Sequence, residues 1–202
     1  MKKSTLTTII VVAVVALLGI WMYNGYNEMV VEQENVESVW AQVEAQYQRR
    51  NDLIPGIAKA AKGDANREIA TLTALFEARS KATSVTVDPS NMTEEQLANY
   101  QQAQSDISSA FSRLLVSVEA YPDLKANQSF QKLIDEWTGT ENRIAAARIT
   151  FNEEAKKYNT LIRKFPKNIL ASIFGFNIKP YFKSEEGAEN TKKLMESIDF
   201  DF

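Results

Sequence analysis

An uncharged, mostly apolar run from Leu6 to Tyr23 constrains this chain more than any other feature of its sequence. A helix rises about 1.5 Å per residue, so this run reaches ~27 Å, close to the ~30 Å hydrocarbon core of a bilayer. The run is longer than the ~7–15-residue apolar region of a signal peptide, and the bulky stretch "GIWMYNGY" stands where small cleavage-site residues would lie. We therefore predict an uncleaved membrane-spanning helix over residues 6–23.

The residues that flank this run predict its orientation. Lys2 and Lys3 precede it, the next basic residue is Arg49, and acidic residues follow it at Glu28, Glu32 and Glu34. The positive-inside rule then places residues 1–5 in the cytoplasm. An interfacial aromatic belt at the far end is predicted for Trp21, Tyr23 and Tyr26. We expect a single-pass protein of the inner (cytoplasmic) membrane, in contact with membrane lipid, whose body lies on the periplasmic or extracellular side.

The composition of the chain excludes several classes of function. Its 202 residues include no histidine and no cysteine, which argues against the usual zinc sites, thiol nucleophiles, haem ligation, Ser-His-Asp triads and disulfides. A net charge of -3, with no cluster of lysines and arginines beyond pairs, gives no electrostatic footprint for nucleic acid. The sequence therefore predicts no cofactor, no metal, no nucleic-acid partner and no catalytic residue set.

After the span, residues 28–62 carry the pattern of a long helix with one buried stripe. Apolar residues recur there at spacings of three, four and seven, at Met29, Val36, Trp40, Val43, Tyr47, Ile54 and Ile57. Pro55 lacks an amide hydrogen and clashes with the carbonyl four residues earlier. We therefore predict that the helix kinks or divides at Pro55, with Asp52 supporting the neighbouring turn.

Three further helices are predicted over residues 67–83, 93–120 and 123–164. Asp64 or Asn66 would cap the first of them, and Thr93 with Gln96 would form a capping box for the second. With short links between them, these elements predict an all-α fold: a long antiparallel four-helix bundle over residues 24–166 with an N-terminal transmembrane helix. A coiled-coil dimer is the competing use of the same apolar stripes.

Two sets of polar residues each occupy one helical face, because residues seven apart return to nearly the same angle. They are Asn35, Gln42 and Arg49 on the first helix, and Glu141, Arg148, Asn152 and Asn159 on the last. If these helices are antiparallel with Asn35 level with Asn159, the two sets meet and Arg49 comes within a turn of Glu141. This polar seam has two interpretations. We favour a network that fixes helix register over a buried charged binding site.

The last helix returns toward the lipid surface, where residues 167–183 form an apolar and aromatic segment fringed by lysines. Gly175 and Pro180 interrupt it, and it is too short to span a bilayer. It is either an interfacial segment that contacts lipid or a flap over the open end of the bundle. In the first case its interfacial residues are Phe174, Phe176, Tyr181 and Phe182. Residues 184–202 are polar and are predicted to form a mobile tail or a short amphipathic helix.

Several segments, in this order and spacing, resemble the LemA family. They are "YNEMVVEQENVESVWAQVEAQYQRRNDLIPGI", "YPDLKANQSFQKL", "TENRIAAARITFNEEAKKYNTLIRKFP", and "FGF" followed by "YF". Phe151-Asn152 stands where the family usually has Tyr-Asn, and "PGI" replaces the more usual Pro-Asn-Leu. The resemblance implies a membrane-anchored bacterial protein with a long antiparallel four-helix bundle and no established catalytic activity.

These features predict a non-enzymatic scaffold or interaction protein of the bacterial cell envelope. Its partner would be a membrane protein or a second copy of the chain. The resemblance implies that it acts as an accessory protein of a membrane protease or another envelope protein. One alternative is an envelope-sensing bundle in which a ligand shifts the kink at Pro55. A further alternative is a hydrolase that uses Asp52 and Glu141.

Overall fold

The computed structural model of the chain describes residues 3–62 and 70–183, and those two ranges contain helices and connecting segments but no strand. The helices found there are α1 (Lys3–Lys62), α2 (Ala70–Ser84), α3 (Glu94–Val118), α4 (Pro122–Lys125), α5 (Gln128–Arg163) and α6 (Lys167–Phe174). The all-α prediction is therefore confirmed. The predicted caps Asp64 and Asn66 and the predicted tail over residues 184–202 lie outside the described residues.

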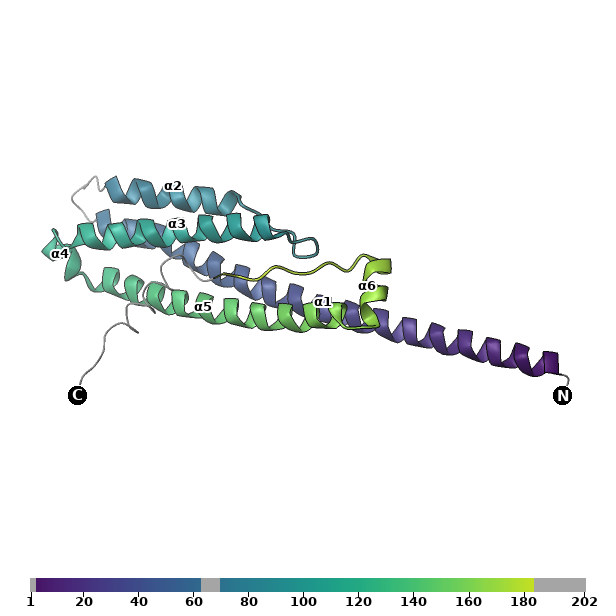
Figure 1. The fold of residues 1–202 in the computed structure, drawn as a ribbon. Coiled ribbons are helices and arrows are strands. Elements are labelled where there is room, and N and C mark those ends of the chain that lie inside the picture. The colour runs from purple at the N-terminus through teal and green to yellow at the C-terminus, as the bar shows by residue number, and fades with distance from the viewer. Residues whose placement is uncertain (1–2, 63–69, 184–202) are drawn as a thin grey trace, which may run out of the picture.

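One continuous helix, α1, joins the predicted span to the body of the protein (Figure 1). Residues 6–20 of α1 are exposed along their whole apolar length, whereas Met29, Val36 and Trp40 are at most 1% exposed. By length and composition, the N-terminal part of α1 could cross a membrane. It is the candidate span that the apolar run predicts.

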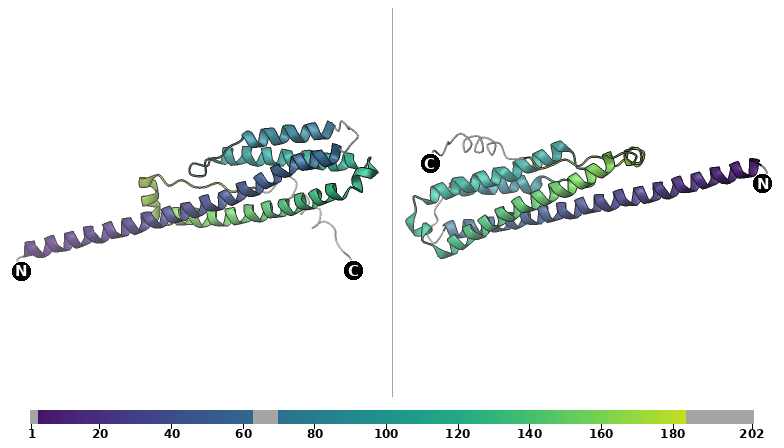
Figure 2. Two further views of the ribbon diagram at one scale, coloured as in Figure 1. Left: turned by 180° about the vertical axis from the view of Figure 1, so that it is seen from behind. Right: turned by 60° about the horizontal axis from the view of Figure 1, so that its bottom comes forward.

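The four long helices lie lengthwise beside one another, and each reverses the direction of the one before (Figures 1 and 2). The body part of α1 packs along α5, and α2 packs along α3. Their buried side chains form two cores. The anchor-side core is built around Met29, Trp40, Tyr47, Tyr100, Phe151 and Tyr158. The distal core is built around Ile54, Leu75, Ile107, Phe111, Phe130 and Trp137.

Side-chain caps set the starts of α3 and α5. Thr93 Oγ1 accepts from the amide of Gln96 at 3.1 Å, and Gln96 Oε1 accepts from the amide of Thr93 at 2.9 Å. The predicted capping box is therefore confirmed. The last long helix begins later than predicted, at Gln128, because the side chain of Asn127 caps its first amides. The short helix α4 occupies the interval before it.

Pro55 lies inside α1, which continues to Lys62, so of the two predicted outcomes, a kink or a division, the division does not occur. Proline leaves the carbonyl of Asn51, four residues earlier, without its helical donor. Nε of Arg79 in α2 donates to that carbonyl at 3.0 Å. Asp52, predicted to support this turn, accepts a hydrogen bond from Gln48 at 2.8 Å. A tertiary contact thus replaces the backbone hydrogen bond that proline removes.

The segment after α6, residues 176–183, runs back along the body in an extended conformation and is called the strap here (Figure 1). Gly175 ends α6 with a φ of 77°, a left-handed conformation that favours glycine. Leu170 and Ala171 of α6 and Phe182 of the strap are buried in the anchor-side core. The strap therefore lies along the body of the protein (Figure 1), with Phe182 packed into it.

Candidate functional site

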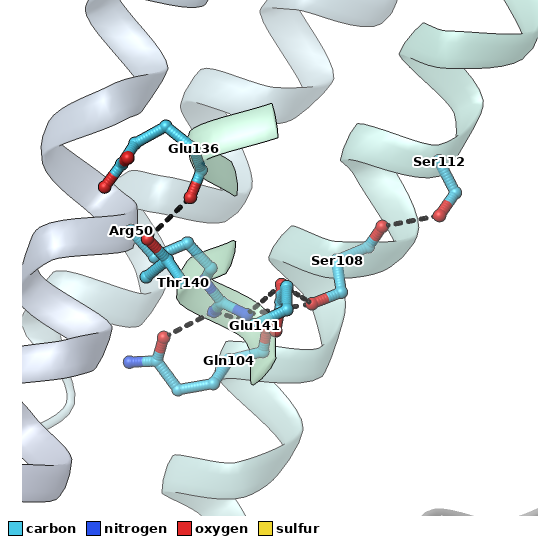
Figure 3. A network of polar contacts seen from close by, with 7 residues as sticks. All are labelled: Arg50, Gln104, Ser108, Ser112, Glu136, Thr140 and Glu141. Carbon is cyan, nitrogen blue, oxygen red and sulfur yellow. Dashed lines mark hydrogen bonds and ion pairs between the residues drawn. The ribbon is translucent and has the colours of Figure 1, made fainter. Parts of the chain in front are cut away.

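Arg50 of α1 is the centre of a buried polar network between three helices (Figure 3). Its Nη1 donates to Ser108 Oγ of α3 at 2.8 Å and to Glu141 Oε1 of α5 at 2.9 Å. Its Nη2 donates to the backbone carbonyl and to the side-chain oxygen of Gln104 in α3, both at 2.8 Å. One guanidinium group thereby joins α1, α3 and α5.

Two aromatic rings and a hydroxyl complete the surroundings of Arg50. Its guanidinium carbon lies 5.2 Å from the ring centre of Tyr47 and 5.6 Å from that of Trp137, within cation–π range. Ser108 Oγ also donates to Glu141 Oε1 at 3.0 Å, so the carboxylate receives two hydrogen bonds. Because an unpaired buried charge is strongly destabilising, Arg50 depends on Glu141, whose side chain is 31% exposed.

The structure corrects the predicted pairing of Arg49 with Glu141. Arg49 is exposed, and its Nε and Nη2 donate to Glu136 Oε1 at 3.0 and 2.6 Å. Arg143 donates to the same oxygen at 2.9 Å. The hydrogen bond and charge of Arg49, reinforced by Arg143, lower the pKa of Glu136 and keep it ionised. The two adjacent arginines bind different partners because successive residues of a helix point about 100° apart. Arg50 therefore points into the protein, whereas Arg49 lies at the exposed edge of the contact between α1 and α5.

The network lacks the convergence that acid–base or metal catalysis requires. The carboxylate of Asp52 is exposed and accepts from Gln48, whereas Glu141 accepts from Arg50 and Ser108. A catalytic pair needs both groups within reach of one substrate position. Within residues 3–62 and 70–183, no group of three or more Asp, Glu, His or Cys side chains could hold a metal ion. The geometry instead suits a link that holds three helices in register.

Asn152 and Asn159 of α5 form a second polar site, which holds the strap. Each side-chain amide donates to the carbonyl of one strap residue and accepts from the amide of the same residue. Asn159 binds Lys179 in this way at 2.7 and 2.8 Å, and Asn152 binds Phe182 at 3.0 and 2.9 Å. An extended segment outside a β-sheet has no neighbouring strand to bind its backbone amides and carbonyls. The two asparagines bind these groups at Lys179 and Phe182, and they thereby fix the register of the strap.

Of the other predicted seam residues, Arg148 also binds the strap, whereas Asn35 and Gln42 do not reach it. Asn35 and Gln42 are exposed on α1, and Nδ2 of Asn35 lies 3.5 Å from Glu32 of the same helix. Nη2 of Arg148 donates to the strap carbonyl of Lys183 at 2.8 Å. The prediction that the two heptad sets pair with each other is therefore wrong. The physical reason is that apolar side chains occupy the buried face of α1 at this level, at Val36, Trp40 and Val43.

Lys179 attaches the strap to the loop before α3. Its side chain is buried, and Nζ donates to the carbonyls of Pro89 and Ser90 at 2.6 and 2.7 Å. Burial lowers the pKa of Lys179, while the charges of Glu37 and Asp88 oppose that shift. The sequence suggested a lysine at the fringe of a membrane-proximal segment, but the fold carries it into the protein.

Three of the predicted interfacial aromatic residues meet just after the candidate span. The ring centre of Tyr26 lies 4.9 Å from that of Phe174 and 5.7 Å from that of Phe176, in edge-on geometry. Trp21 packs against the anchor-side core, and Tyr23 is 69% exposed. The fold thus brings Tyr26, Phe174 and Phe176 together beside the part of α1 that follows the candidate span. The contact of these aromatic side chains with lipid stays a prediction.

The two remaining interfacial predictions lie further along the strap. Phe182 is buried, with ring centres 6.0 Å from Trp40 and 5.4 Å from Phe151, so its predicted place at the interface is wrong. The hydroxyl of Tyr181 accepts from Asn159 at 3.0 Å. An extended chain rises about 3.3 Å per residue, so the strap moves ~20 Å along the body between Phe176 and Phe182.

Comparison with known proteins gives this fold a family. A sequence model of the LemA family matches residues 39–200. The magnetosome protein MamQ 2 of Paramagnetospirillum magneticum is 25% identical, with 96% of this chain and 78% of the relative covered. MamQ of Magnetospirillum gryphiswaldense is 32% identical over 43% of this chain and 32% of its own length. Protein LemA of Metamycoplasma hominis is 27% identical over 79% of this chain and 69% of its own length.

The fold and its sites define an all-α protein with one candidate membrane span, long helices joined by a buried arginine, and a strap bound along their surface. Because the family model covers well over half of its length, the chain belongs to the LemA family. It is a LemA-like, membrane-associated protein, and the resemblance drawn from its sequence segments is confirmed.

Heptad reasoning missed Arg50, although the sequence carries a signal for it. The apolar stripe of α1 passes from Tyr47 to Ile54 and omits a position between them. Arg50 fills that gap, because spacings of three and four lead from Tyr47 through Arg50 to Ile54. Its partners Gln104 and Ser108 have no comparable signal, since polar residues also cover the exposed faces of helices.

Proposed function

We propose that this protein is a membrane-anchored, non-enzymatic helical scaffold of the bacterial cell envelope. In this proposal α1, α2, α3 and α5 act as one antiparallel four-helix bundle on the periplasmic side of the inner membrane. The bundle holds a membrane-protein partner, such as a membrane protease, or a second copy of the chain.

The observation that carries the proposal is the continuity of α1. The same helix contains the candidate span and a buried stripe that packs along α5, with no break between Lys3 and Lys62. At about 1.5 Å per residue such a helix is ~90 Å long. A partner bound to the body would therefore be held at a set distance from the bilayer, and in a set orientation, rather than on a flexible linker.

The polar sites support a scaffold over an enzyme. Arg50 and Glu141 bind each other, and Asn152 and Asn159 bind the strap, so these groups face the protein rather than a substrate. The relatives are named for the magnetosome and for the LemA family, and neither name specifies a reaction.

The contact between Arg79 and Asn51 favours a second candidate function, an envelope sensor. Arg79 of α2 donates to the carbonyl that Pro55 leaves without a helical donor. A ligand that displaced α2 would remove this hydrogen bond and free α1 to bend at the proline. In-cell cross-linking between α1 and α2 that changes with an envelope stress would support this function, and an invariant pattern would exclude it.

The scaffold proposal is tested by site-specific photo-cross-linking in native membranes. A photoreactive amino acid replaces Val116 or Ile149, two exposed apolar side chains outside α6, and exposed Lys59 provides a polar control position. We expect one membrane protein, or a second copy of the chain, to be captured reproducibly from an apolar position. Capture of neither from any position would contradict the proposal.

The orientation is tested separately with single-cysteine variants, because the natural chain has no cysteine. In spheroplasts, a membrane-impermeant maleimide should label Lys59→Cys without lysis. Ala61→Cys is a matched control, since Ala61 is buried and should react only after unfolding. Labelling of Lys59→Cys only after lysis would place the body in the cytoplasm.

A further inference from the structure

The short helix α6 lies across the long axis of α1 rather than along it (Figures 1 and 2). Its buried side chains, Leu170 and Ala171, face the anchor-side core. Its other apolar side chains are exposed: Ile169 is 49% exposed and Ile173 is 65% exposed. These two residues are four apart and therefore share one face of the helix. Helix α6 thus presents an apolar stripe away from the protein.

Contacts with α1 fix the position of α6 just beyond the candidate span. A Cβ added to Gly25 would lie 2.8 Å from Leu170 Cδ1, so the absence of a side chain at Gly25 lets α6 approach the helix closely. Tyr26 packs edge-on against Phe174 at 4.9 Å. Lys167 forms an ion pair with Glu28. All three contacts come from consecutive or nearly consecutive residues of α1.

The level of these contacts can be compared with the thickness of a bilayer. Gly25 and Glu28 follow the end of the apolar run at Tyr23 by two and five residues, which is about 3–8 Å along a helix. The headgroup region adds roughly 5–8 Å to each side of the hydrocarbon core. Helix α6 therefore falls within the headgroup layer when the run from Leu6 to Tyr23 spans the core.

We propose that α6 is a second membrane contact, which lies in the plane of the lipid headgroups with Ile169 and Ile173 directed into the acyl-chain boundary. The inference rests on the proposed function, because it requires the span. The partner is the lipid bilayer surface itself. Phe165, in the turn before α6, is 82% exposed and supplies a further apolar side chain, and the exposed Lys164 beside it suits the phosphate level.

Continuity with the span favours lipid as the occupant of this surface. Exposed apolar side chains of α1 extend as far as Met22 and Tyr23, and α6 contacts α1 at Gly25, within a helical turn of them. A helix crosswise to a transmembrane helix, and docked on it by a tight glycine contact, has the orientation of an interfacial helix. This second contact would prevent the body from turning about the axis of its anchor.

The test uses the full chain in phosphatidylcholine vesicles that contain phosphatidylcholine spin-labelled near the top of its acyl chain. Single cysteines carry an environment-sensitive fluorophore at Ile173 and Ile169 on the apolar stripe and at Ser172 on a neighbouring exposed face of α6. Ile149 of α5 is the matched control, since its exposure of 61% is close to that of Ile173. Leu17 in the span reports insertion of the anchor.

We expect the spin label to quench most of the fluorescence at Ile169, Ile173 and Leu17, less at Ser172, and none above background at Ile149. If Leu17 is quenched while Ile173 behaves like Ile149, the proposal for α6 is overturned and the membrane anchor stands. If Leu17 is not quenched, the predicted span is wrong, and both the proposed function and the proposal for α6 are then contradicted. Unquenched Ile173 that instead forms disulfides between copies would assign the stripe to a dimer interface and also overturn the proposal.

Discussion

Two polar sites on α5 contrast sharply in what they bind. Glu141 meets the guanidinium of Arg50, a charged group buried at the junction between the anchor-side and distal cores. Asn152 and Asn159 meet uncharged backbone groups of the strap. Heptad spacing places all three α5 residues on one face of the helix, but the neighbours that they meet are different.

A buried charge and a neutral amide place different demands on their surroundings, although heptad spacing treats the two alike. A buried charge needs an opposite charge and several hydrogen bonds at fixed positions, so the Arg50 network constrains three helices at once. A neutral amide has no charge to compensate, so one donor and one acceptor of an extended backbone are enough to pair it with the strap. We therefore expect the arginine to control the stability of the whole body and the asparagines to control the strap alone.

The largest expected effect is that of Arg50→Ala. Removal of the buried guanidinium leaves Glu141 without its opposite charge and the two oxygens of Gln104 without their donor, and we expect a loss of about 3–5 kcal/mol in the free energy of unfolding. Arg49→Ala is the matched control, since its pair with Glu136 is exposed and should contribute little to stability. The measurement is urea unfolding of the full chain in detergent, followed by tryptophan fluorescence.

A double-mutant cycle sharpens this test. Arg50→Ala and Glu141→Ala should be strongly non-additive, whereas Arg49→Ala and Glu141→Ala should add, because Arg49 binds Glu136 instead. Equal losses from the two arginine variants would refute the assignment of Arg50 as the link between helices.

A smaller and more local effect is expected from Asn159→Ala. The variant leaves the amide and carbonyl of Lys179 without partners, at a cost of about 1–3 kcal/mol. Hydrogen exchange followed by mass spectrometry should show faster exchange in the strap and little change in α2 and α3. Asn142→Ala, at an exposed position of the same helix, should exchange like the natural protein. A uniform increase throughout the body would mean that the asparagine supports the whole fold.

At neutral pH the smallest effect is that of Tyr158→Phe, which becomes visible only in alkali. Burial raises the pKa of Tyr158 to about 12. An unfolded tyrosine releases its proton near pH ~10 while the folded one retains it, so the stability of the anchor-side core falls as the pH rises from about 10 to 12.

Lys179 acts in the opposite direction at lower pH. Its folded pKa is lowered, so between that pKa and the unfolded value of ~10.4 the unfolded chain holds more protons than the folded chain, and stability rises with pH within that window. We therefore expect exchange in the strap to be slowest near pH ~10 after correction for intrinsic exchange rates, and Tyr158→Phe to shift the alkaline loss upward. Tyr121→Phe is the exposed control, and an equal shift in that variant would contradict the assignment.

Some parts of the structure follow from local sequence alone. The apolar run, the stripe of α1 and the capping box at Thr93 each depend on residues within a few turns of one another, and the structure contains all three elements. The register between helices is less predictable. A repeat of seven identifies a helical face but does not say which neighbour covers that face. For this reason the sequence predicted Arg49, rather than Arg50, as the partner of Glu141.

Pro55 is a second position at which local sequence does not identify the tertiary contact. The sequence identifies a carbonyl that must lose its helical hydrogen bond, and local rules then predict either a kink or a division of α1. Arg79, distant in sequence, donates to that carbonyl at 3.0 Å, and the helix continues. No local pattern identifies which donor on another helix will compensate for a proline.

Local periodicity and the order of segments are sufficient to identify a membrane-length apolar helix, a series of long amphipathic helices and membership of the LemA family. The burial of Arg50, the binding of the strap by Asn152 and Asn159, and the position of α6 across α1 beside Gly25 become visible in the three-dimensional structure (Figure 1). These are contacts between residues far apart in the chain, and they depend on which helical faces pack together and which side chains leave room for them.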